Sequence, residues 1–132
     1  MSAAGAVGVR SAPLAALLAL LIPSGPGAAG EADVLAARAQ CRGEVCDFQA
    51  TLRHADTGWD HYADRFEIVG PDDAVLGTRV LRHPHVDEQP FTRGLRGLRV
   101  PEALKRVRVR AGDSQHGLGG AEVEVELSRG GD

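Results

Sequence analysis

The sequence contains few of the residues on which many small domains depend. Its 132 residues include 2 cysteines, 1 tryptophan, 1 tyrosine and 3 phenylalanines, and Lys105 is its single lysine. After Ile22 no apolar run approaches the roughly 20 residues that span a bilayer, so no membrane span is expected in the mature chain. With 15 basic against 18 acidic residues, the charge argues against nucleic acid as a partner.

The motifs of common hydrolases are also missing. There is no Gly-x-Ser-x-Gly nucleophile elbow, and Ser114 and Ser128 are the only serines after residue 32. Ser114 and His116 cannot make a catalytic triad by themselves, because the general base must approach the nucleophile from across a pocket. The adjacent acids Asp87 and Glu88 would point to opposite faces of an extended segment, unlike a glycosidase pair. The sequence therefore favours a binding or structural module over an enzyme.

The first 32 residues have the pattern of a secretory signal peptide. Arg10 precedes an apolar run from Leu14 to Ile22, and a tail of small residues, proline and glycine follows. Small residues suit a peptidase at several positions, so cleavage is expected between Ala29 and Ala32, most favourably after Ala32. Residues 1–32 are thus predicted to be a signal peptide and residues 33–132 a single exported domain, periplasmic or secreted.

The two cysteines, Cys41 and Cys46, lie close together in a chain that is predicted to be exported. Disulfides persist outside the cytoplasm, so a bridge between them is expected. Their four-residue spacing suits a hairpin in which the two residues face each other across neighbouring strands. A redox-active pair would instead have the Cys-x-x-Cys spacing at the start of a helix. The pair is therefore predicted to be a local structural staple.

Alternation of apolar and polar residues dominates the rest of the chain and predicts strands. Phe48, Ala50 and Leu52 would face one side of a sheet, with polar neighbours on the other. The same pattern recurs in six further segments: Asp33 to Cys41, Asp64 to Val69, Val75 to His83, Thr92 to Val100, Lys105 to Ala111, and Glu122 to Leu127. About seven short strands in roughly 100 residues predict an all-β fold, an immunoglobulin-like or fibronectin-type antiparallel β-sandwich. Trp59, Phe48, Phe66 and Phe91 are expected to supply its aromatic core.

Strand direction predicts which connections share an end of this sandwich. If successive strands run in opposite directions, the connections after the second, fourth and sixth strands lie together. These connections contain all five histidines: His54, His61, His83, His85 and His116. They also contain several acids, among them Asp56, Asp60, Asp64, Asp87, Glu88 and Asp113. The expected concentration of imidazoles and carboxylates at one end is the strongest functional signal in the sequence.

Three interpretations of these connections remain open. Imidazoles with a carboxylate suit zinc or copper, and His83-Pro84-His85 would hold two rings near each other. We therefore predict a metal site of His61, His83, His85 and His116, with Asp60, Glu88 or Asp113 as further ligands or hydrogen-bond acceptors. Alternatively, these residues satisfy the backbone of long connections through turns and buried hydrogen bonds. A surface that recognises another exported protein or a glycan is a further possibility.

The segment Thr51 to Leu95, with the later "AGDSQHGLGG", resembles a family of small exported bacterial proteins of unknown function. The motifs that carry this resemblance are "LRHADTGWDHYAD" and "HPHVDEQPFTR". It implies export and a compact domain, and it brings no site residues with it.

Overall fold

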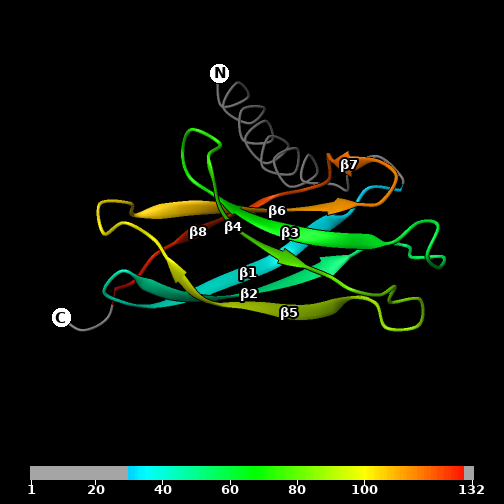
Figure 1. The fold of residues 1–132 in the computed structure, drawn as a ribbon, viewed down its shortest axis with the longest axis horizontal. Helices are drawn as coiled ribbons and strands as arrows, with labels where there is room; N and C mark the ends of the chain where they lie inside the picture. Colours follow the sequence, from blue (N-terminus) through cyan, green and yellow to red (C-terminus); the bar gives the residue numbers. More distant parts are fainter. Residues whose placement is uncertain (1–29, 130–132) are drawn as a thin grey trace, which may run out of the picture.

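The computed structural model describes residues 30–129, which form an antiparallel β-sandwich without helices (Figure 1). The predicted signal peptide lies outside the described residues except for Gly30–Ala32. Along the chain the strands are β1 (Asp33–Arg42), β2 (Val45–Arg53), β3 (Ala63–Val69), β4 (Val75–Val80), β5 (Phe91–Arg99), β6 (Arg106–Asp113), β7 (Gly117–Leu118) and β8 (Val123–Glu126). One sheet has the order β1-β2-β5, and the other has the order β4-β3-β6-β7, with β8 also paired to β6. The predicted all-β antiparallel sandwich is confirmed.

The core lies between the two sheets and is built by alternating side chains. In β2 the side chains of Cys46, Phe48, Ala50 and Leu52 are buried, and the residues between them face outward. The opposing sheet contributes Phe66, Ile68, Val69, Val107, Val109 and Ala111. Burying one such aliphatic or aromatic side chain stabilises the fold by about 1.5–3 kcal/mol, so these residues hold the sheets together.

Two details of the strand prediction and one of the core prediction need correction. The structure has eight strands rather than seven, because the two-residue β7 is too short to show alternation in the sequence. Strand β4 ends at Val80 rather than at His83, since Pro84 follows shortly and cannot donate to a ladder. Trp59 is not a core residue: it is 66% exposed and packs edge-on against Tyr62.

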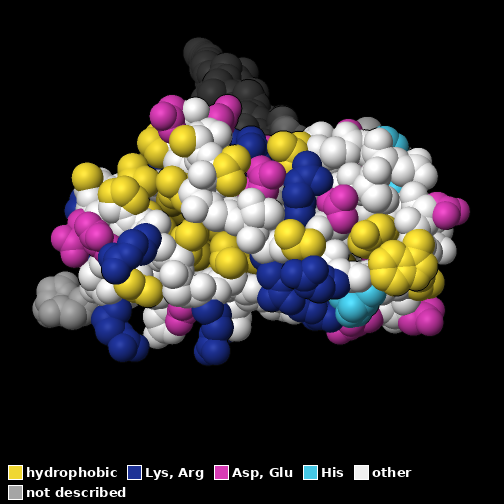
Figure 2. Space-filling model, viewed as in Figure 1, with side chains coloured by type: hydrophobic (Ala, Val, Ile, Leu, Met, Phe, Trp, Pro, Cys, Tyr) yellow, Lys and Arg dark blue, Asp and Glu magenta, His cyan; other side chains and the backbone are white. Residues whose placement is uncertain are grey.

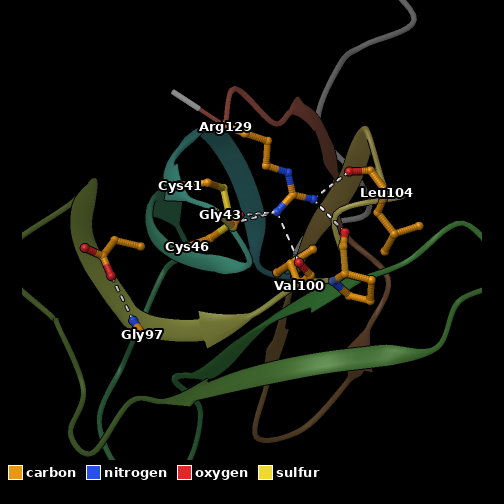
Figure 3. Close-up of a disulfide and its surroundings, with 9 residues drawn as sticks. Cys41, Gly43, Cys46, Gly97, Val100, Leu104 and Arg129 are labelled. Atoms are coloured by element: carbon orange, nitrogen blue, oxygen red, sulfur yellow. Dashed lines mark hydrogen bonds between the residues drawn. A yellow bond between two sulfur atoms is a disulfide. The ribbon is translucent and has the colours of Figure 1, made fainter. Parts of the chain in front are cut away.

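Cys41 and Cys46 form the predicted disulfide (Figure 3). They occupy directly opposed positions in the β1–β2 ladder, next to the turn at Gly43 and Glu44. The side chain of Arg129, which follows β8, reaches the same hairpin. The staple fixes the hairpin at the left-hand end of the sandwich in Figure 1, and the histidine side chains visible in Figure 2 lie at the other end.

Removal of this disulfide is expected to have only a modest effect on stability. The closed loop is short, so its loss should lower the free energy of unfolding by about 2 kcal/mol, at the low end for disulfides. Urea unfolding of the Cys41→Ser/Cys46→Ser double variant against the oxidised parent measures this difference. A loss of the whole fold would contradict a purely local role.

Candidate histidine and aspartate site

The connections β2–β3, β4–β5 and β6–β7 lie at one end of the sandwich, the right-hand end in Figure 1. The histidine side chains that Figure 2 shows are also at that end. Hydrogen bonds join the first and third of these connections. The backbone N–H of Ser114 donates to the carbonyl of Tyr62 (2.9 Å), and the backbone N–H of Tyr62 donates to the Ser114 hydroxyl (3.1 Å). The amide of Gln115 donates to the Asp60 carbonyl at 2.8 Å. These bonds bring His61 close to His116.

Asp56 is the buried centre of the β2–β3 connection. Its Oδ1 accepts hydrogen bonds from the ring Nδ1 of His54 at 2.5 Å and from the backbone N–H of Ala63 at 3.1 Å. Its Oδ2 accepts from the backbone N–H of His85 at 2.6 Å. A carboxylate that accepts from Nδ1 fixes the histidine proton there, so Nε2 of neutral His54 carries a lone pair. Asp56 thereby orients the His54 ring as the ring of a metal-ligating histidine is oriented.

Asp113 ends β6 and turns its carboxylate toward the histidines. Oδ1 accepts from the backbone N–H groups of Gln115 (2.8 Å) and His116 (2.5 Å), and Oδ2 faces His54 and His61. Burial alone would raise the pKa of Asp113. The hydrogen bonds from the backbone of His116 and Gln115 and from the His116 ring outweigh this effect and hold the pKa below its ordinary value. Asp113 is therefore an ionised, buried carboxylate.

The side chains of His54, His61 and Asp113 converge at this end, and His116 contacts the last two. Nε2 of His54 lies 3.3 Å from Nε2 of His61, and Oδ2 of Asp113 lies 3.2 Å and 3.6 Å from these two atoms. Nδ1 of His116 lies 3.1 Å from Oδ2 of Asp113 and 3.2 Å from Nε2 of His61. The ligand atoms of His54, His61 and Asp113 thus form one close group suited to a metal ion. His54 and Asp113 are fully enclosed, whereas His61 and His116 have partly exposed side chains.

The segment before β1 approaches the same cluster. The carbonyl oxygen of Gly30 lies 2.9 Å from Nε2 of His54 and 3.1 Å from Nε2 of His61. Gly30 has a φ of +95°, and a Cβ at this position would lie 2.8 Å from Cε1 of His116. Only glycine fits this left-handed backbone next to the ring without displacement. A further acceptor oxygen therefore faces the two histidine nitrogens.

His83 and His85 form a second group, separate from this cluster. Their rings pack against each other with centroids 4.6 Å apart, and His85 stacks on Phe91 at 3.9 Å. Nε2 of His85 accepts a hydrogen bond from Arg93 at 2.9 Å. Burial first, and then the charge of Arg93, lower the pKa of His85. A neutral His85 that packs and accepts in this way has a structural role.

The metal ligands predicted from the sequence therefore fall into two sets, those inside the cluster and those outside it. His61 and His116 lie in the cluster, His83 and His85 do not, and Asp60 contributes only its backbone carbonyl nearby. Glu88 instead pairs with Arg93 at 3.3 Å. His54 was missing from the predicted ligands, although the His-x-Asp spacing of His54 and Asp56 at a strand end is a signal that could have found it.

The comparisons with known proteins identify one curated relative. A protein of Halomicrobium mukohataei with the name "Putative lipoprotein" is 39% identical over 88 residues, which cover 67% of this chain and 43% of the relative. The chain therefore spans less than half of that protein's length. No family model and no solved structure matches the chain. The relative's name assigns it no activity, in agreement with a resemblance to proteins of unknown function. Residues 30–129 contain no apolar helix of membrane-spanning length.

Proposed function

We propose that this domain binds a late first-row divalent metal ion, zinc or copper, through His54, His61 and Asp113, with His116 as a further ligand. The spacing of the donor atoms is the observation that carries the proposal. Ligand atoms about 2.0 Å from a tetrahedral zinc ion lie about 3.3 Å apart. The three distances among His54, His61 and Asp113 are 3.2, 3.3 and 3.6 Å, which are those of one face of such a tetrahedron.

The balance of hydrogen-bond donors and acceptors in the cluster supports the same function. When the one proton of His54 is on Nδ1 and donated to Asp56, the lone pair of Nε2 faces the Gly30 carbonyl and the Asp113 carboxylate. Acceptors that converge in a buried place repel one another unless a cation lies among them. Two imidazoles and a carboxylate supply nitrogen and oxygen donors that zinc and copper both accept. A metal ion replaces this repulsion by attraction to every donor atom.

Calorimetric titration of chelator-treated protein with zinc and with copper tests the proposal. We expect one ion to bind per chain, and we expect His61→Ala to weaken its binding by about 100-fold or more, because it removes a ligand rather than a supporting residue. His61 is partly exposed, so this variant should fold.

His83→Ala is the matched control for this titration. His83 is an exposed histidine of the same end that lies outside the cluster. Its replacement should leave the affinity unchanged. Absence of heat with both ions, or an equal loss of affinity in His61→Ala and His83→Ala, would exclude this site.

We also propose that the chain is exported and that its leader is cleaved between Ala29 and Gly30. The name of the similar lipoprotein supports export, and Gly27 and Ala29 offer the small residues that a signal peptidase requires. Cleavage after Ala32 would remove a fully buried residue and the Gly30 carbonyl that faces His54. Mass spectrometry of protein purified after export should find Gly30 at the N-terminus; a chain that begins at Asp33 would contradict this.

The strand order supports an immunoglobulin-like type of sandwich. In that type the first, second and fifth strands share one sheet, and the third, sixth and last strands share the other. Here β1, β2 and β5 form one sheet, while β3, β6 and β8 lie in the other, with β4 at its edge. In the constant type the fourth strand pairs with the fifth, whereas here β4 pairs with β3. An experimental structure in which β3 and β6 joined the sheet of β1, β2 and β5 would contradict the assignment.

A further inference from the structure

A basic groove runs along the boundary between the two sheets, away from the histidine and aspartate cluster. One concavity of about 880 Å³ is lined in part by Arg38, Arg79 and Arg96, and a second of about 540 Å³ is lined in part by Arg79, Arg82 and Arg93. Arg79 borders both, so the two concavities adjoin. Figure 2 shows basic side chains gathered beside a histidine on this face. We call these five arginines and the two concavities the arginine groove.

The charge of the groove is not balanced by the protein itself. The side chains of Arg82 and Arg96 make no hydrogen bond or ion pair with any residue of the segment 30–129. The one acid that lines the groove, Asp47, accepts a hydrogen bond from the backbone N–H of Gly97 at 2.8 Å. Glu88, which pairs with Arg93, is largely exposed. Although the chain has more acidic than basic residues, its surface is therefore positively charged along the groove.

The acidic residues of the neighbouring sheet pair with arginines outside the groove. Arg65 and Arg110 both pair with Glu67, and Arg108 pairs with Asp73 and Glu122. Arginines on the β3–β6 surface are therefore neutralised within the domain. An arginine without an acid can bind an external carboxylate with two parallel hydrogen bonds, which makes an acidic ligand the chemical complement of the groove.

The groove also lies between two sheet edges. β4 is the edge strand of its sheet and β5 is the edge strand of the other, so each has a sheet neighbour on one side only. Arg79 spans the boundary, since its Nη1 donates to the carbonyl of Gly94 in β5 at 2.5 Å. Unpaired edges offer backbone N–H and C=O groups that an extended peptide can use.

The composition of the groove distinguishes a peptide from an acidic polysaccharide. Sugar rings pack their apolar faces on exposed aromatic rings, and neither Trp59 nor Tyr62 lines the groove. Phe48, its one phenylalanine, is buried in the core. Gly94 adds no side chain to the floor, so an extended chain can approach the β5 backbone closely once Arg79 turns from the Gly94 carbonyl to the ligand. We propose that the arginine groove binds an extended acidic peptide segment of another protein.

Fluorescence anisotropy with a labelled peptide of alternating glutamate and threonine tests this proposal. We expect saturable binding that weakens as salt is raised, because the contacts are ion pairs at the surface. A peptide with glutamine in place of glutamate should bind at least about tenfold more weakly. Metal-free protein is suitable, since the groove does not depend on the metal site.

Charge reversal in the groove provides the matched comparison. The Arg82→Glu/Arg96→Glu variant changes two exposed side chains without partners among residues 30–129, so it should fold, and it should lose at least about tenfold in affinity. The Arg42→Glu/Arg106→Glu variant makes the same change in net charge outside the groove and should bind normally. Equal weakening in both variants, equal binding of the glutamine peptide, or tighter binding of oligogalacturonate than of the acidic peptide would each overturn the proposal.

Discussion

Replacement of Asp56 by alanine is expected to lower the free energy of unfolding by about 3–5 kcal/mol, the cost of removing one partner from a buried charged network. The Asp56 carboxylate is fully enclosed and accepts three hydrogen bonds, from the His54 ring and from the backbone of Ala63 and His85. Alanine would leave all three donors buried without an acceptor. Urea unfolding of the variant, followed by circular dichroism, measures the change.

Asp56→Asn is the control that separates shape from charge. An asparagine can still accept from His54 and Ala63 through its oxygen, but its NH₂ group would meet the N–H of His85, so one hydrogen bond is lost. We expect a loss of about 1–3 kcal/mol. If both variants are as stable as the parent, Asp56 does not organise the connection. Because Asp56 orients His54, the asparagine variant should also bind metal about 10- to 100-fold more weakly.

Replacement of Arg129 by alanine is expected to lower the free energy of unfolding by about 3 kcal/mol. Its guanidinium donates to four carbonyl oxygens at the end opposite the histidines (Figure 3). They belong to Gly43 (2.9 Å), Val100 (3.1 Å), Pro101 (2.6 Å) and Leu104 (2.8 Å). One side chain thus joins the β1–β2 hairpin to the β5–β6 connection. Thermal and urea unfolding of the variant would measure the loss.

Arg129→Lys tests whether the forked geometry matters. A lysine keeps the charge but is a single point donor, so it should recover only part of the lost stability. Arg106→Ala serves as the control, because Arg106 is exposed and pairs only with the exposed Glu126. That pair should contribute at most about 1 kcal/mol. A loss from Arg129→Ala no larger than that from Arg106→Ala would mean that the carbonyl contacts do not stabilise the domain.

Much of the fold could be predicted from the sequence because its signals are local. Alternation at Phe48, Ala50 and Leu52 predicts which face of β2 is buried, since side chains in a strand point alternately to opposite sides. The spacing of Cys41 and Cys46 predicts the disulfide for a similar reason, because a short hairpin places them opposite each other. Trp59 shows where this reasoning fails. An aromatic residue at the tip of a connection is buried only if another element covers it, and periodicity does not report that.

The histidines show most clearly which features a sequence can predict and which depend on tertiary packing. Because strand direction alternates along the chain, the sequence was enough to predict that the connections of the five histidines share one end. The convergence of His54, His61 and Asp113, and the separate stack of His83 on His85 and of His85 on Phe91, became known from the packed sheets alone. This arrangement depends on rotamers and on hydrogen bonds between residues distant in sequence, such as Asp56 with His85 and Tyr62 with Ser114. Such contacts form only when the sheets have packed, and no local pattern encodes them.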